Sequence, residues 1–187
     1  MSLSALWSAT WILAVGTSLA GGAGAFTLHV DGAPQVAKDQ VYDRGGCDGA
    51  NRSPALSWSS PPAGTRSLAI TMFDPDAPGH GWWHWIVADL PANLRGLPAN
   101  AGAASGGSLP PGAFQGRNDF GEFGYGGPCP PLGDPPHHYV ITVWALRSAR
   151  LPVEHSALDR TIEAALRHDA IASARAVLTY GRSRASR

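Results

Sequence analysis

The chain has 187 residues, of which 44% are hydrophobic and only 15% are charged, and its formal net charge is zero. This composition indicates one folded domain, excludes a largely disordered chain and argues against a nucleic-acid partner, which would need a basic surface. The 23 glycines and 16 prolines interrupt the chain too often for a helical bundle, so we expect short strands joined by loops.

The first 25 residues differ from the rest. They contain no charged residue, and an apolar run from Leu6 to Ala20 leads to the small-residue triplet Ala23-Gly24-Ala25. We predict a signal peptide over residues 1–25 and a periplasmic or secreted chain that begins at Phe26. No Lys or Arg precedes the run, which departs from the usual pattern. The alternative is an uncleaved anchor, but Ser, Thr and Gly interrupt the run, so no stable membrane span is expected.

Two cysteines, Cys47 and Cys129, are the only ones in the chain. In an exported protein such a pair is expected to form one disulfide. The alternative is two buried free thiols, which behave as small hydrophobic side chains. No CxxC spacing is present, so these two residues alone do not predict a metal site.

Strand signals recur along the chain. Phe26–Val30 and Pro54–Trp58 are expected to be extended, and the strongest strand patterns cover Ser67–Phe73, Trp83–Leu90 and Tyr139–Leu146. The strands Ser67–Phe73 and Tyr139–Leu146 are apolar on both faces, which predicts central, buried strands. Residues 91–136 are expected to be mostly irregular.

The pattern changes after Pro152. Helix-forming residues predict a helix over Thr161–Arg167, a short second helix over Ala170–Arg175 and a last strand over Ala176–Tyr180. We therefore expect one domain over residues 26–181 and a flexible tail over residues 182–187.

Polar groups gather at the ends of the strong strands. Asp74-Pro75-Asp76-Ala77-Pro78 follows one strand, Trp82-Trp83-His84-Trp85 opens the next, and His137-His138-Tyr139 opens the third after a loop rich in Gly and Pro. If these strands are neighbours, Asp74, Asp76, His84 and His137 converge at one sheet edge. A carboxylate beside an imidazole raises the pKa of the imidazole, and the resulting cation, with N–H groups of the Gly-rich loop, attracts an anion such as a phosphomonoester. The alternative is that each Asp caps a turn and each His is a core residue.

The same segments resemble the phosphatidylethanolamine-binding protein family, in its bacterial YbhB/YbcL or Raf kinase inhibitor-like type. Supporting motifs are Ser53-Pro54-Ala55-Leu56-Ser57-Trp58, Asn118-Asp119-Phe120-Gly121 and Gly124-Tyr125-Gly126-Gly127-Pro128-Cys129-Pro130-Pro131. The resemblance implies a mainly β fold, with a large antiparallel sheet packed on a smaller sheet and short helices near the C-terminus. It also implies an anion pocket made of Asp74, Asp76, His84, Gly127, Pro128, His137 and Tyr139. Around this pocket we expect walls from Trp83, Trp85, Pro75 and Pro78, although Trp85 can face the core instead.

These features favour a binding or regulatory protein with no catalytic residues, no metal and no cofactor. The expected partner is a small phosphate-bearing ligand: a phospholipid head group, a phosphomonoester or a phosphorylated protein. The alternative is a hydrolase or metal-dependent enzyme that uses the same Asp/His cluster. Against it, the chain has no G-x-S-x-G, H-E-x-x-H or P-loop motif. Unpaired edge strands leave pairing into a homodimer open.

Overall fold

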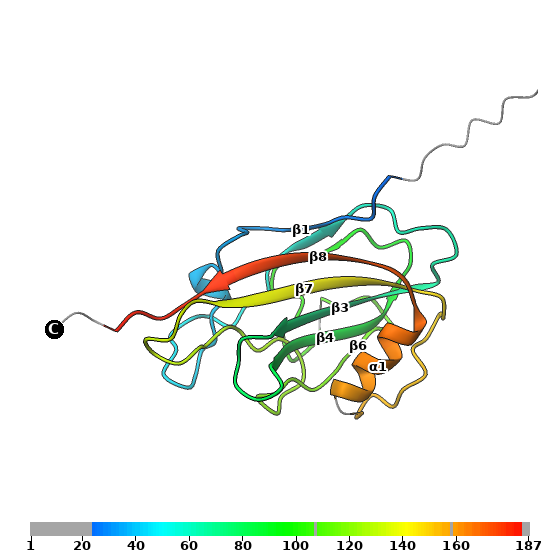
Figure 1. Cartoon of the computed structure of the whole chain (residues 1–187). Coiled ribbons are helices and arrows are strands. Elements are labelled where there is room, and N and C mark those ends of the chain that lie inside the picture. Colours follow the sequence, from blue (N-terminus) through cyan, green and yellow to red (C-terminus); the bar gives the residue numbers. More distant parts are fainter. Residues whose placement is uncertain (1–23, 107, 158, 185–187) are drawn as a thin grey trace, which may run out of the picture.

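Two antiparallel β-sheets form the fold in a computed structural model that describes residues 24–106, 108–157 and 159–184 (Figure 1). The large sheet has the strand order β6-β4-β3-β7-β8, and the small sheet has the order β1-β2-β5. The strands of the large sheet are β3 (Ser67–Asp74), β4 (Trp82–Pro91), β6 (Phe114–Gln115), β7 (His137–Leu146) and β8 (Ala170–Tyr180). Those of the small sheet are β1 (Leu28–Val30), β2 (Leu56–Trp58) and β5 (Gly96–Leu97). A 3₁₀ turn, η1 (Lys38–Gln40), and one α-helix, α1 (Asp159–Asp169), complete the elements described.

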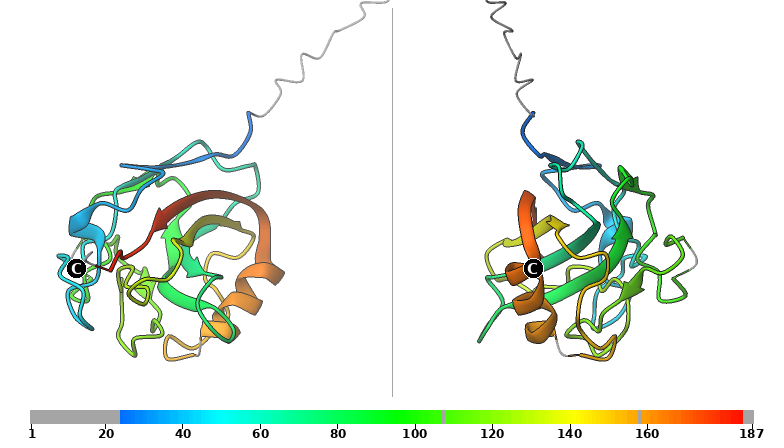
Figure 2. Two further views of the ribbon diagram at one scale, coloured as in Figure 1. Left: turned by 60° about the vertical axis from the view of Figure 1, so that its left-hand side comes forward. Right: turned by 90° about the vertical axis from the view of Figure 1, so that its right-hand side faces the viewer.

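Two hydrophobic cores lie on opposite faces of the large sheet. Side chains at alternate positions of β3, such as Leu68, Ile70 and Met72, enter the core between the two sheets. The intervening face contributes Ala69 to a second core that α1 closes with Ile162 and Leu166. Figure 2 shows α1 on one side of the large sheet and the N-terminal segments on the other. The predicted mainly β fold, with a large antiparallel sheet on a smaller one, is confirmed.

One prediction about the C-terminal segment is wrong. Residues Ala170–Arg175 do not form a second helix but the first half of β8, which pairs with β7 from Leu146↔Ala170 to His137↔Tyr180. The helix formers in this stretch favour a helix locally, but ten paired residues along β7 override that weak preference. The helix instead ends at Asp169, whose carboxylate accepts hydrogen bonds from the N–H and the hydroxyl of Ser148.

A β-bulge interrupts the pairing of β3 with β4. Met72 lies opposite Trp85 and Phe73 lies opposite Trp83, so His84 is an extra residue with no partner on β3. Such a bulge lets two successive side chains point to the same side of the sheet. His84 and Trp85 therefore both face the side of the small sheet, and His84 is brought to the end of the sheet where β3 finishes.

The disulfide predicted between Cys47 and Cys129 is present and joins the loop after η1 to the long loop before β7. Arg182 connects the same two loops from the C-terminal end, because its guanidinium donates to the carbonyl oxygens of Gly46 and Pro130. Residues 1–23 of the predicted leader and residues 185–187 of the predicted tail lie outside the described residues. Within the described part of the chain, no helix is long and apolar enough to cross a membrane.

Candidate functional site

A small cavity lies where three strands of the large sheet begin or end, at the left-hand end of this sheet in Figure 1. β3 ends at Asp74, β4 begins at Trp82 and β7 begins at His137. Because β3 lies between β4 and β7, these three ends meet at one edge. The cavity has a volume of about 230 Å³. The residues that line it are Asp74, Ala77, Pro78, Trp82, His84, Phe120, Cys129, Pro130, Pro131, His137 and Tyr139.

A buried acid–imidazole pair forms the floor of this cavity. Nδ1 of His137 lies 2.7 Å from Oδ2 of Asp74, and the two side chains are only 7% and 4% exposed. The other oxygen of Asp74 accepts hydrogen bonds from the backbone N–H groups of Asp76 and Ala77, at 2.9 and 3.2 Å. Asp74 therefore shapes the Asp-Pro turn with one oxygen and orients His137 with the other, which leaves Nε2 of His137 available.

The second imidazole of the cavity is held differently. His84 is buried, and its Nδ1 lies 2.6 Å from the carbonyl oxygen of Gly126. A carbonyl oxygen only accepts, so Nδ1 must carry the proton and Nε2 is left with a lone pair. Burial lowers the pKa of His84 to about 4, with the Gly126 carbonyl opposing this shift only in part. The prediction of a positively charged imidazole is therefore wrong for His84, which is neutral near pH 7.

Two buried hydrogen-bond donors of the cavity wall have no partner among the described residues. They are Nε1 of Trp82 and the hydroxyl of Tyr139. A buried polar group without a partner costs about 1–3 kcal/mol, so such groups are uncommon unless a water or a ligand meets them. Burial also raises the pKa of Tyr139, with Asp74 adding to the effect, so its hydroxyl stays protonated and able to donate.

Aromatic and proline side chains close the cavity, and sequence reasoning missed several of them. Phe120 stacks on Tyr42 with ring centroids 4.1 Å apart, and it meets Trp82 and His84 edge-on at 5.3 and 5.7 Å. The Asn-Asp-Phe-Gly motif contains Phe120, but the sequence alone predicts only that this ring holds the long loop on the sheet, not that it lines the cavity. The disulfide fixes Cys129, and with it the wall residues Pro130 and Pro131.

Asp76 does not reach the cavity. Its carboxylate accepts hydrogen bonds from the backbone N–H and from Nδ1 of His138, at 2.7 and 2.8 Å, and both side chains are largely exposed. These contacts, with the N–H of His138 first, lower the pKa of Asp76. The structure thus forms two acid–imidazole pairs on successive residues of β7, with one pair inside the cavity and the other outside.

Gly127 and Pro128 support the wall without lining the cavity. The N–H of Gly127 donates to Oδ1 of Asn51 at 2.7 Å, and the carbonyl of Pro128 accepts from the N–H of Tyr42. A Cβ atom on Gly127 would come within 2.2 Å of the carbonyl oxygen of Gln40, so only glycine fits there. The Gly127 N–H is therefore not free for an anion.

The predicted wall residues are divided between the two faces of the large sheet. Pro78 lines the cavity, but Pro75 is exposed and Trp83 packs in the core beneath α1. Trp85 lies in the core between the sheets, where its Nε1 donates to Oε1 of Gln115 at 2.9 Å. The tryptophan of this run that lines the cavity is Trp82, one residue before the predicted Trp83.

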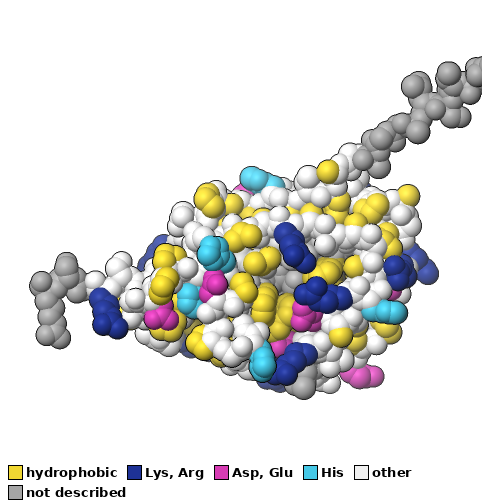
Figure 3. Space-filling model, in the orientation of Figure 1, with side chains coloured by type: hydrophobic (Ala, Val, Ile, Leu, Met, Phe, Trp, Pro, Cys, Tyr) yellow, Lys and Arg dark blue, Asp and Glu magenta, His cyan; other side chains and the backbone are white. Residues whose placement is uncertain are grey.

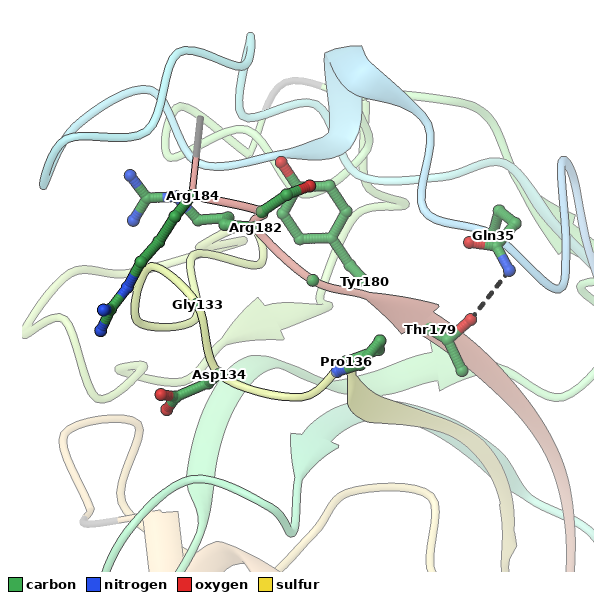
Figure 4. Close-up of a pocket in the computed structure, with 10 residues that line it drawn as sticks. Gln35, Gly133, Asp134, Pro136, Thr179, Tyr180, Arg182 and Arg184 are labelled. Atoms are coloured by element: carbon green, nitrogen blue, oxygen red, sulfur yellow. Dashed lines mark hydrogen bonds between the residues drawn. The ribbon is translucent and has the colours of Figure 1, made fainter. Parts of the chain in front are cut away.

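Two other hollows are less suited to a specific ligand. An open hollow of about 630 Å³ lies beside the C-terminal segment, with hydrogen-bonded Gln35 and Thr179 at one end and Arg182, Arg184 and Asp134 at the other (Figure 4). The guanidinium of Arg182 is engaged by backbone carbonyls. On the α1 side of the large sheet, basic and hydrophobic side chains are mixed on the surface, and the groove among them measures only about 150 Å³ (Figure 3). Within the residues described, no three His, Cys, Asp or Glu side chains group as metal ligands.

A β-sandwich with a small, partly enclosed cavity at the ends of neighbouring strands has the architecture of a ligand-binding protein. The family model described as phosphatidylethanolamine-binding protein matches residues 32–181. The chain belongs to this family, which makes it a binding protein in general terms.

Individual relatives agree with this assignment. UPF0098 protein YbcL of Escherichia coli is 48% identical over 147 residues, which cover 78% of this chain and 80% of YbcL. UPF0098 protein YbhB of the same organism is 44% identical and is covered to 84%. The crystal structure of E. coli YbcL, described as a new member of the mammalian PEBP family, superposes with a TM-score of 0.81 and 44% identity over 83% of this chain and 98% of that one. Putative lipoprotein LppC of Mycobacterium tuberculosis is 40% identical over 119 residues, which cover 64% of this chain and 52% of LppC.

Proposed function

We propose that this protein binds a small phosphate-bearing group in the cavity formed by Asp74, His84, His137 and Tyr139. The observation that carries this proposal is a pair of buried donors that have no partner in the described part of the chain, Nε1 of Trp82 and the Tyr139 hydroxyl. Oxygen atoms of a phosphate accept hydrogen bonds from such donors, and Nε2 of His137 becomes a third donor when that ring is protonated. The volume of about 230 Å³ suits a head group or a small phosphomonoester rather than a whole lipid.

Binding accounts for the cavity better than hydrolysis does. Cys129 is held in a disulfide, so its sulfur is not a nucleophile, and the only hydroxyl among the described lining residues belongs to Tyr139. Asp74 already accepts three hydrogen bonds, which leaves it poorly placed to take a proton from water. The name of the matched family, phosphatidylethanolamine-binding protein, supports a phosphorylated guest.

Calorimetric titration of residues 26–187 with phosphate and phosphoethanolamine at pH 6 tests the proposal. We expect both ligands to bind, and we expect the His137→Ala and Tyr139→Phe variants to bind at least about tenfold more weakly. His138→Ala is the matched control, because it removes a neighbouring imidazole that faces outside, and it should bind as the wild type does. Absence of binding by a folded wild-type protein would contradict the proposal.

We propose further that the protein acts outside the cytoplasm, after removal of residues 1–25. A disulfide persists in oxidising compartments, and the relative LppC carries the name of a putative lipoprotein. Intact-mass analysis of the protein recovered from the exported fraction tests this point, with Phe26 expected as the first residue. A cytoplasmic, full-length product with reduced cysteines would contradict it.

A further inference from the structure

The two imidazoles of the cavity present different chemistry to a guest. Nδ1 of His84 faces the carbonyl oxygen of Gly126. Because a carbonyl oxygen only accepts hydrogen bonds, Nδ1 carries the proton of the neutral ring and Nε2 keeps its lone pair. His137 turns Nδ1 to the Asp74 carboxylate, which also balances the charge of a ring protonated on Nε2. His84 therefore offers only an acceptor to the cavity. His137 also presents an acceptor on Nε2 while its ring is neutral, and it presents a donor only when the ring is protonated.

Among the described residues, the wall contains no permanent positive charge. The described residues that line the cavity include neither Lys nor Arg, and the one carboxylate among them belongs to Asp74. A fully ionised oxyanion would place one of its oxygens against the lone pair of His84, and lone pair against lone pair is repulsive. A guest that carries a proton on one of its oxygens would instead donate a hydrogen bond to Nε2 of His84.

We infer that the cavity selects a protonated oxyanion, the monoanionic form of a phosphomonoester, and rejects oxyanions of the same shape that lack the proton. This inference rests on the proposed function and adds the ionisation state of the ligand to it. In the complex the P–OH donates to Nε2 of His84. The other phosphate oxygens accept from Tyr139 and Trp82, and from His137 once that ring is protonated. The binding reaction involves no covalent step.

The titratable groups that face His84 are compatible with a ligand P–OH group that donates to Nε2 of His84. These groups are Asp74 at the end of β3, and His137 and Tyr139 on β7. His84 stays neutral down to a pH near 4, and Tyr139 stays protonated, so neither changes its role between pH 5 and pH 8. A phosphomonoester, in contrast, loses its second proton with a pKa of about 6. A change in the protonation of His137 acts on both ligands of a matched pair, so the preference for one ligand over the other should follow the ionisation of the ligand.

Methyl phosphate and methyl sulfate are the probes for the test. At pH 5 both are monoanions of similar size, and they differ mainly by the one proton that methyl phosphate retains. We expect calorimetry on the wild-type protein to show methyl phosphate binding roughly tenfold to a hundredfold more tightly at pH 5, because the sulfate leaves a buried acceptor unpaired. At pH 8, where methyl phosphate is a dianion, this advantage should disappear.

The outcomes separate this inference from the proposed function. Equal binding of the two ligands at pH 5, or a preference for methyl phosphate that persists at pH 8, overturns the inference but leaves a phosphate-binding cavity in place. Binding of neither ligand overturns both. A preference at pH 5 that is lost at pH 8 supports the inference.

A variant and a spectrum test the role of His84 directly. His84→Gln replaces a fixed acceptor by an amide that can turn either its oxygen or its NH₂ to the ligand, so the preference should fall to within about threefold, while His138→Gln should keep it. Because the buried variant can fail to fold, ¹⁵N-detected imidazole spectra of the wild type provide an independent test. They should show His84 protonated on Nδ1 and not on Nε2 at pH 7, and protonation on Nε2 instead would overturn the inference.

Discussion

The two acid–imidazole pairs at the start of β7 have the same chemical composition and opposite surroundings. His137 and Asp74 are almost fully buried at the cavity, whereas their neighbours His138 and Asp76 are 57% and 42% exposed on the other face of the strand. The N···O distances are nearly equal, at 2.7 and 2.8 Å. What differs is the solvent, since water screens the outer pair and offers its groups other partners, while the inner pair depends on its own contacts. The comparison teaches that position across one strand, rather than residue type, decides which pair is a candidate for binding.

The largest expected effect comes from breaking the inner pair. Asp74→Ala should lower the free energy of unfolding by about 3–5 kcal/mol, because it leaves buried N–H groups and His137 without their acceptor. Urea denaturation followed by tryptophan fluorescence measures this change. Asp76→Ala is the matched control on the outer pair and should cost less than about 1 kcal/mol. Similar costs for the two variants would contradict the comparison.

Acid should expose the cost of keeping His84 neutral. The unfolded chain takes up a proton on this residue near its ordinary pKa of 6.5, but the folded chain does so only near 4, so the unfolded state binds more protons between these values. Stability should therefore fall by about 3 kcal/mol as the pH drops from 6.5 to 4. Carboxylates also titrate near the lower limit, so the informative quantity is the difference between wild type and His84→Gln. If the free energy of unfolding fell equally with pH in both proteins, the loss of stability could not come from protonation of His84.

Removal of the unpaired hydroxyl should separate stability from binding. Tyr139→Phe deletes a buried donor that has no partner in the described part of the chain, so the ligand-free protein should keep its stability or gain up to about 1–2 kcal/mol. The same variant should bind phosphoethanolamine about tenfold more weakly. Thermal unfolding with and without ligand measures both effects, and a clear loss of stability without ligand would show that the hydroxyl has a partner within the protein.

The smallest effect is expected on the outside of the strand. His138→Ala removes an exposed imidazole whose contact with Asp76 is screened by water, so both stability and ligand affinity should stay within about 1 kcal/mol of the wild-type values. A marked loss of affinity in this variant would mean that the binding surface extends over the outer face of β7.

The strongest parts of the fold could be predicted from local pattern. The strands Ser67–Phe73 and Tyr139–Leu146 are found within one or two residues of the predicted bounds, because apolar residues on both faces indicate burial under any topology. Residues Ala170–Arg175 could not be assigned in this way, since alanine-rich segments favour helices until a neighbouring strand supplies a partner.

For the cavity, sequence reasoning gave the residue types but not every orientation. Asp74, His84, His137 and Tyr139 do come together. Trp83 was misplaced because a shift of one residue turns a side chain to the opposite face, and the bulge at His84 changes the alternation of faces within the run. Trp85 faces the core, which was the alternative expected for it. The backbone N–H groups of the Gly-rich loop were expected to be free for an anion, but the N–H of Gly127 donates to the side chain of Asn51. Asn51 is distant in sequence, so no local motif predicts this contact.

The bulge at His84 also bears on how such a cavity can arise or be lost. Asp74↔Trp82 and Phe73↔Trp83 follow one register and Met72↔Trp85 follows the next, so deletion of His84 alone would bring these pairs into one register and leave the second shift, between Leu68 and Ile70, in place. The sheet has no need of this residue for its own pairing. A single-codon deletion would therefore keep the pairing of β3 with β4 and remove the acceptor of the cavity. It would also remove the carbonyl oxygen of His84 that accepts from the N–H of Gly126, so the loop before β7 would lose one of its attachments to the sheet.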